Sequence, residues 1–249
     1  MKSKPNPWRR VIAALFWFGV WELAAYRLNL PFAIPSVEST ASALWGMLRT
    51  IPFWQTVLAS LGRIAAGLLT GTALGVLLAA LTIWSPLADA IVRPMQNVIR
   101  STPVASFILL LWVLIGRDAV PTVIAVLMVM PVIWQALCDA YQTLDPTLND
   151  VVRAFHATPL QRLILFVAPS LRPSFLTAFA TSAGLAWKSG IAAEIIAYTA
   201  HSIGRSISDA RNLFNGPEMM AWTVCVVILS MLCEKLISRV IGGFSHPSR

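Results

Sequence analysis

The chain has 249 residues, of which 57% are hydrophobic and 12% are charged, and its mean hydropathy is +0.71. These values lie outside the range of soluble globular proteins and indicate a membrane protein. The net charge of +8 does not require a nucleic acid partner, because cations concentrated in the cytoplasmic loops of a membrane protein explain it.

Six apolar stretches are candidates for membrane-spanning helices. Two of them, 64–88 and 119–138, contain no ionisable residue and are long enough to cross a hydrocarbon core of roughly 30 Å. The other four are interrupted or shortened by a charge, and they are 11–26, 101–116, 173–200 and 219–241. The sequence therefore predicts an all-α membrane protein of about six transmembrane helices. No small-x-small cleavage site follows the first stretch, so we expect no cleaved signal peptide.

The distribution of cations predicts the orientation of these spans. With six spans and an interior N-terminus, twelve cations fall inside and six outside, which favours both termini in the cytoplasm. The interior set is Lys2, Lys4, Arg9, Arg10, Arg93, Arg100, Arg153, Arg162, Arg172, Lys235, Arg239 and Arg249. The exterior set is Arg27, Arg49, Arg63, Arg117, Arg205 and Arg211.

A row of small residues marks one face of the span at 64–88. Gly67, Gly71 and Gly75 recur every four residues, and Ala79 continues the row. Another helix can approach the backbone closely along such a face. The row predicts either a contact within this chain or an interface between subunits.

Residues 146–166 encode two short amphipathic helices between the fourth and fifth spans. Asp145 with Pro146 is a start signal for the first helix. Thr158, Pro159 and Gln161 form the capping-box pattern T-x-x-Q at the start of the second. By the charge count this elbow is cytoplasmic, and an apolar face with a polar tip is suited to binding a cytosolic partner.

Two ionisable residues, Lys188 and Glu194, lie within the fifth span, where charge is costly unless it faces protein or water. Their spacing of six places them on different faces of a helix, whereas Trp187 shares a face with Glu194, with Gly190 and Ile191 between them. Trp187, Lys188, Gly190, Ile191 and Glu194 are therefore candidate pore-lining residues. The alternative for Glu194 is a structural role, in which it bonds buried backbone or hydroxyl groups.

Two further features are expected on the outer side. Residues 37–49 have the spacing of a short amphipathic helix, for contact with the membrane surface or an external protein. His201, Arg205 and Arg211 lie in the loop after the fifth span, where they are either solvated or in contact with such a protein.

The elbow resembles the cytoplasmic loop of the permeases of binding-protein-dependent, ATP-driven importers, whose pattern is E-A-A-x-x-x-G followed by I-x-L-P. The corresponding run is "DVVRAFH", from Asp150 to His156, and Pro169 stands at the matching distance. Asp150 replaces the glutamate, His156 the glycine and Ala168 the leucine. A glycine tolerates positive φ that a histidine does not, so we expect either a helical backbone at His156 or a direct contact with the partner.

The flanking segments extend this resemblance over roughly residues 34–241. "TVLASLGRIAAGLLTGTALGVLLA", "STPVASFILLLWVLIG" and "AWKSGIAAEII" are similar to S-x-x-R-x-x-x-G, I-P-x-x-A-x-x-P-L and A-W-x-x-x-x-A-A-E of the nitrate, sulfonate, taurine and bicarbonate branch. The resemblance implies the MetI-like type I permease fold. It also implies a division into 1–33, with the first transmembrane helix, a permease domain at 34–241, and a tail at 242–249.

An importer of this kind needs ATP hydrolysis, which requires a G-x-x-x-x-G-K-[ST] loop. None of the four lysines follows a glycine, so this chain is not the ATPase. The resemblance implies a non-enzymatic pathway subunit in a bacterial cytoplasmic membrane that binds no cofactor itself, with ATP and magnesium on the partner. The implied partners are two ATPase subunits, a second permease copy, and a periplasmic or lipid-anchored solute-binding protein.

The resemblance assigns ATPase coupling to residues of the elbow: Asp150, Arg153, Ala154, Phe155, His156, Ala157, Thr158 and Pro159. No metal site is expected, since Cys138, Cys225 and Cys233 have no ligand spacing. No catalytic residue is expected either, because neither H-E-x-x-H nor G-x-S-x-G occurs.

The alternative function is a secondary transporter driven by an ion gradient, whose signature of inverted repeats is not evident here. The transported solute stays open among nitrate, sulfonates, taurine, bicarbonate and pyrimidine precursors of thiamine.

Overall fold

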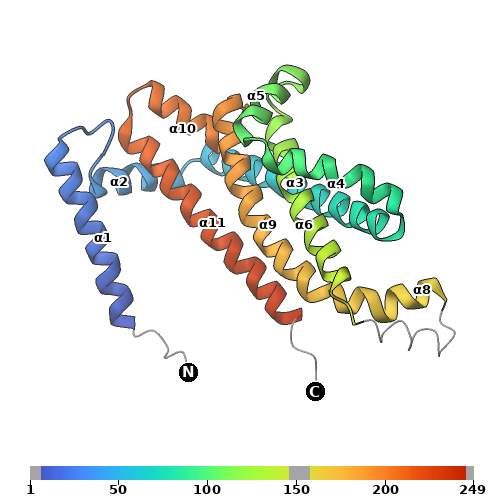
Figure 1. The fold of residues 1–249 in the computed structure, drawn as a ribbon. Coiled ribbons are helices and arrows are strands. Elements are labelled where there is room, and N and C mark those ends of the chain that lie inside the picture. The colour runs from blue at the N-terminus through green and yellow to red at the C-terminus, as the bar shows by residue number, and fades with distance from the viewer. Residues whose placement is uncertain (1–6, 146–157, 245–249) are drawn as a thin grey trace.

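The protein is described by a computed structural model that covers residues 7–145 and 158–244, and helices are its only regular elements in these two ranges. Figure 1 shows their arrangement. In chain order the helices are α1 (Pro7–Leu28), α2 (Val37–Leu48), α3 (Ile51–Trp84), α4 (Pro86–Ser101), α5 (Val104–Ile115), α6 (Val120–Gln142), α8 (Pro159–Arg162), the π-helical turn η1 (Leu163–Val167), α9 (Ala168–Ala197), α10 (Ile203–Asn212) and α11 (Gly216–Phe244).

Five helical segments in the described ranges are long and apolar enough to cross a membrane. They are contributed by α1, α3, α6, η1 with α9, and α11. A sixth apolar region is formed by α4 and α5 together, which are bent by 104° at their junction. The prediction of an all-helical membrane protein with about six spans is thus confirmed at the level of fold class.

The stretch predicted as a span at 101–116 does not form a spanning helix by itself. The helix there, α5, has 12 residues, which corresponds to about 18 Å at 1.5 Å per residue, too short to cross the hydrocarbon core. Thr102 separates it from α4 with an extended backbone (φ −84°, ψ 132°). The next residue is Pro103, and a proline disfavours the helical conformation of the residue before it.

A proline also sets the end of the span predicted at 64–88, so its observed bounds differ from the predicted ones. Helix α3 begins at Ile51 and ends at Trp84, because Ser85 is extended (φ −133°, ψ 115°) and precedes Pro86. The Ser85 side chain then accepts a hydrogen bond from the Ala88 N–H and caps α4.

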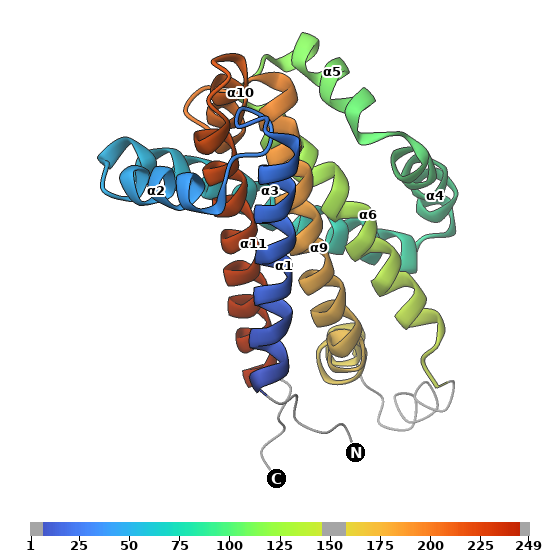
Figure 2. The same ribbon diagram turned by 90° about the vertical axis from the view of Figure 1, so that its left-hand side faces the viewer.

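Helix α6 lies at the centre of the core and packs against both α3 and α9, and Figure 2 shows it beside α9. Trp134 on α6 is fully buried, and its Nε1 donates a 3.0 Å hydrogen bond to Thr82 Oγ1 on α3. This bond satisfies the indole N–H in an otherwise apolar interior.

The glycine row of α3 faces α6. A Cβ atom on Gly67 would lie 2.5 Å from Ala125 Cβ, one on Gly71 2.9 Å from Val129 Cβ, and one on Gly75 2.8 Å from Ile133 Cβ. Only residues without a side chain allow the two backbones to come this close. The structure thus places the row in a contact within the chain.

Helix α1 stands apart from the other spanning helices in Figure 1 and is connected to them at its C-terminal end. Trp21 Nε1 donates to Pro35 O at 3.0 Å, and the Glu22 carboxylate accepts a 2.9 Å hydrogen bond from Val37 N, in the first turn of α2. Glu22, which interrupts the first apolar stretch, therefore stabilises a helix N-terminus.

Candidate functional site

The polar features suited to function lie at opposite ends of the helical bundle. At one end lie α8, the N-terminal end of α1 and the C-terminal end of α11, with α8 and α1 on opposite sides of the bundle in Figure 1. At the other end lie α10 and the turn that joins it to α9. The two ends are described in this order.

The second helix of the elbow begins with the predicted capping box. The Thr158 N–H donates to Gln161 Oε1 at 2.8 Å, and the Gln161 N–H donates to Thr158 Oγ1 at 3.3 Å. Pro159 is the first residue of α8. Of the other residues assigned to coupling, Asp150, Arg153, Ala154, Phe155, His156 and Ala157 lie outside the described residues.

From α8 the chain remains helical through η1 to the end of α9 at Ala197. Pro169 lies in the first turn of α9 and Pro173 in its interior. Each proline removes one backbone donor, and the π-helical turn η1, which ends at Val167, also interrupts the regular hydrogen-bond ladder. The capped end of the elbow is therefore joined to the fifth span by helix without an intervening loop, and this helix changes direction between α8 and the later turns of α9 (Figure 1).

At the opposite end, two segments that stand out in the sequence meet around a buried carboxylate. Glu194 on α9 is fully buried, and its Oε2 accepts hydrogen bonds from Ser60 Oγ at 2.9 Å and from Gly204 N at 3.2 Å. Arg63 Nε lies 3.6 Å from Glu194 Oε1. We call Ser60, Arg63, Glu194 and Gly204 the Glu194 cluster.

The Glu194 cluster joins α3, α9 and α10. Ser60 also accepts a 3.0 Å hydrogen bond from Ile203 N, so the hydroxyl links α3 to the first turn of α10. A Cβ atom on Gly204 would lie 2.4 Å from Glu194 Cβ, which shows why glycine is needed where α10 meets α9. Ser60 and Arg63 of the S-x-x-R motif thus contact Glu194 of the A-A-E motif. The sequence did not predict that these two motifs meet.

The turn between α9 and α10 is held by neighbouring segments. Tyr198 and His201 have positive φ values of 54° and 46°, a conformation that costs a non-glycine residue roughly 1 kcal/mol or more. The Arg63 guanidinium donates to Ala200 O at 3.0 Å and to His201 O at 2.6 Å. Asp118, before α6, accepts a 3.0 Å hydrogen bond from Ala200 N.

The outer charges predicted in this loop lie mainly on α10. Arg205 is 3.5 Å from Asp209 and stacks on the Tyr198 ring, with 4.7 Å from its guanidinium carbon to the ring centroid. The Tyr198 hydroxyl donates to Asp209, and this hydrogen bond raises the pKa of Tyr198. His201 and Arg211 are exposed.

The candidate pore-lining residues divide into two groups. Trp187, Gly190, Ile191 and Glu194 are buried, with Trp187 Nε1 donating to Val226 O on α11 and Gly190 packed against Ile64 on α3. Lys188 is exposed. The contacts of Glu194 are those of the structural alternative, and a role in lining a pore stays a prediction for all five residues.

No cluster of three or more histidine, cysteine or acidic side chains suited to a metal ion occurs within 7–145 and 158–244. Cys138 and Cys225 are buried and Cys233 is half-buried, all three as free thiols.

Comparison with known proteins agrees with this architecture. The chain is 23% identical to a putative ABC transporter permease of Methanocaldococcus jannaschii over 87% of its own length and 83% of that protein. It is 23% identical to the taurine transport system permease TauC of Escherichia coli (86% and 80% covered) and 28% identical to the nitrate import permease NrtB of Leptolyngbya laminosa (74% and 66% covered).

A solved structure shares the fold. In the inward-facing MetNI methionine ABC transporter, one chain superposes with a TM-score of 0.62 at 20% identity, covering 81% of this chain and 97% of that one. The model of the family described as "binding-protein-dependent transport system inner membrane component" matches residues 71–247. The chain therefore belongs to this family and is a MetI-like permease of the ABC importer type.

Proposed function

We propose that the chain forms the membrane pathway of an ATP-driven importer and is coupled to a separate ATPase through residues 146–166. The observation that carries this proposal is the family match over 71–247, which includes the elbow and the span that follows it. Both described ends of the chain and α8 lie at one end of the bundle (Figure 1). We assign this end to the cytoplasm of a bacterial cell, because the excess of cations falls on that side.

The continuity of α8, η1 and α9 supports a simple coupling mechanism. Because no loop separates the elbow from α9, a displacement of α8 would be passed to α9 through the bent helix that joins them. When the ATPase subunits close on ATP, movement of the elbow would shift α9, and with it the Glu194 cluster that joins α9 to α3 and α10. The two polar ends of the protein would move together.

The proposed complex contains two copies of this permease, two ATPase subunits and an external solute-binding protein. ATP and magnesium would be bound by the ATPase alone. Residues 34–241 form the permease domain in this scheme, preceded by the segment with α1 at 1–33 and followed by a cytoplasmic tail at 242–249. A heterodimer with a different permease is the alternative for the pair.

The solute is proposed to be a small anion. The support is the set of relatives named for taurine, nitrate and bicarbonate, at 23 to 29% identity. Lys188, an exposed cation of α9, is the candidate for attracting such a solute.

Copurification tests the coupling assignment. The wild-type permease should be isolated together with a P-loop ATPase, and His156→Asp should release it, because an added carboxylate at the joint of the elbow opposes docking without removing core volume. Arg239→Asp is the matched control, since Arg239 is an exposed residue near the end of α11 at the same end of the bundle. ATPase retention and substrate-stimulated hydrolysis at wild-type levels in His156→Asp would contradict the assignment.

A variant that weakens the capping box should weaken binding of the ATPase to the extent that it destabilises the start of α8. Gln161→Ala removes the acceptor for Thr158 N–H and is expected to destabilise the start of α8 by about 1 kcal/mol, whereas Gln161→Glu retains a capping box. Titration of the ATPase onto the purified permease should show weaker binding for Gln161→Ala and near-normal binding for Gln161→Glu. Equal weakening in both variants would mean that the amide itself contacts the ATPase.

A further inference from the structure

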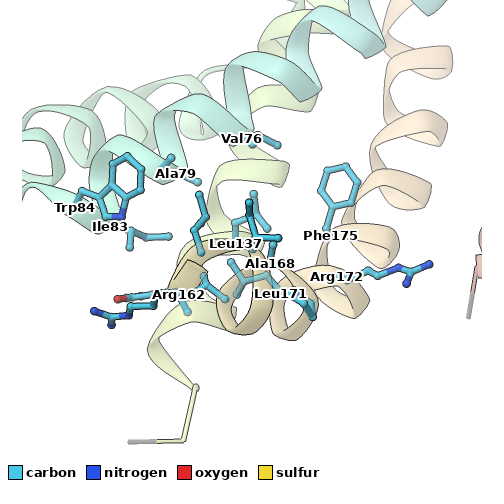
Figure 3. Close-up of a pocket in the computed structure, with 16 residues that line it drawn as sticks. Val76, Ala79, Ile83, Trp84, Leu137, Arg162, Ala168, Leu171, Arg172 and Phe175 are labelled. Carbon is cyan, nitrogen blue, oxygen red and sulfur yellow. The ribbon is translucent and has the colours of Figure 1, made fainter. Parts of the chain in front are cut away.

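A large groove opens between α3, α6, η1 and α9 at the end of the bundle that carries α8. Its volume is about 1210 Å³, larger than the roughly 300 to 1,000 Å³ of typical small-molecule pockets. Figure 3 shows Val76, Ala79 and Ile83 of α3 on one side and Leu171 and Phe175 of α9 on the other. The groove is therefore bounded by spanning helices rather than by loops.

The lining of the groove is apolar in its interior and basic at its edges. Most of the lining residues are aliphatic or aromatic, and the charged ones are Arg162 and Arg172. Their guanidinium groups lie on opposite sides of the groove and point away from each other (Figure 3). None of the described residues that line it is acidic.

The position of the groove corresponds to a membrane interface. Trp84 is the last residue of α3, is largely exposed and forms part of the groove wall together with Tyr141, near the end of α6. Aromatic side chains with a polar atom concentrate at the level of the lipid headgroups, as do arginines that snorkel from the apolar region. Acyl chains would lie in the apolar interior and a headgroup at the arginines.

We propose that this groove binds an anionic phospholipid of the cytoplasmic leaflet, with its acyl chains on the apolar wall and its phosphate at Arg162 or Arg172. The charge of the rim selects an anionic headgroup, since basic pockets between spanning helices on this side of a membrane bind such lipids. A small hydrophilic solute would leave most of the apolar wall without a partner. The groove includes η1, so a bound lipid stabilises the segment between the elbow and α9.

The test uses the purified permease complex in detergent, with phosphatidylglycerol and phosphatidylcholine as probes. Native mass spectrometry counts the lipid retained, and thermal unfolding measures the stabilisation by each added lipid. Phosphatidylglycerol should be retained and should raise the unfolding temperature more than phosphatidylcholine. If both lipids act equally, the proposal is wrong.

Two kinds of variant locate the site. The double variant Arg162→Gln, Arg172→Gln should bind phosphatidylglycerol about 25-fold more weakly, at roughly fivefold for each arginine near an anionic lipid. The matched control Lys235→Gln, Arg239→Gln removes two exposed cations from α11 and should bind it as the wild type does. Ala168→Trp, at an exposed position on the groove wall, should displace the lipid without changing charge.

Phosphatidylglycerol binding of wild-type strength in either the double variant or Ala168→Trp would overturn the assignment of the groove. Displacement of the lipid by the transported solute would also overturn it, since the groove would then belong to the solute pathway. None of these measurements depends on ATP, so they remain informative even if the proposed coupling to an ATPase is wrong.

Discussion

Replacing Gly67 with valine is expected to abolish recovery of folded permease. A Cβ atom at this position would lie 2.5 Å from Ala125 Cβ and 2.7 Å from Thr122 O, both on α6. The backbone oxygen cannot move without shifting α6, so the two helices must separate along the packed core. Overpacking of this kind costs about 1 to 3 kcal/mol or more, and the two further carbon atoms of valine increase it.

Gly62→Val is the matched control for this prediction. Gly62 lies on the same helix, and a Cβ atom there would meet nothing within 4 Å. Size-exclusion chromatography and thermal unfolding in detergent should give a normal profile for Gly62→Val and an aggregated or absent peak for Gly67→Val. A monodisperse Gly67→Val protein with wild-type stability would show that α3 and α6 do not pack as described.

Removing the carboxylate of the Glu194 cluster is expected to have the second large effect. Glu194→Ala leaves the Gly204 N–H and the Ser60 hydroxyl without their acceptor and Arg63 without its nearest carboxylate. Breaking a buried charge pair costs about 3 to 5 kcal/mol, and we expect the low end of this range because the Arg63 side chain is 20% exposed. The free energy of unfolding should fall accordingly.

Further variants show how much of the loss in unfolding free energy comes from the contacts of the Glu194 carboxylate. Ser60→Ala removes one bond to the carboxylate and should destabilise the protein less than Glu194→Ala, and the two changes together should cost less than their sum because they share an interaction. Glu38→Ala, at an exposed position on α2, is the control for loss of a carboxylate and should be nearly neutral. Equal unfolding midpoints for Glu194→Ala and Glu38→Ala would show that the cluster contributes nothing to stability.

The broad architecture was predictable because its signals are local or compositional. The length of the apolar stretches predicted the membrane-spanning helices, and the T-x-x-Q pattern predicted the reciprocal hydrogen bonds between Thr158 and Gln161. The helix boundaries differ from the predicted ones at 64–88 and 101–116, because the prediction followed hydropathy and did not consider the backbone before each proline. Ser85 before Pro86 and Thr102 before Pro103 are local signals for both breaks.

The Glu194 cluster could not be predicted in the same way. Ser60 and Glu194 are 134 residues apart, and periodicity on one helix says nothing about which other helix faces it. The helical wheel grouped Glu194 with Trp187 on one face, but it did not distinguish a lipid, a pore or a neighbouring helix as the environment of that face. The helical continuity of α8 and η1 with α9 was also not predicted, because Pro169 and Pro173 look like helix boundaries in the sequence.

Reconstitution into proteoliposomes tests the central claim most directly. The permease is incorporated with its copurifying ATPase, the solute-binding protein loaded with labelled solute is added on the opposite face, and uptake is measured with and without ATP. The account predicts uptake only when the ATPase, ATP and binding protein are all present, with none from the permease alone under a proton or sodium gradient. Gradient-driven uptake by the permease alone, without ATP, would contradict it and would make the protein a secondary transporter.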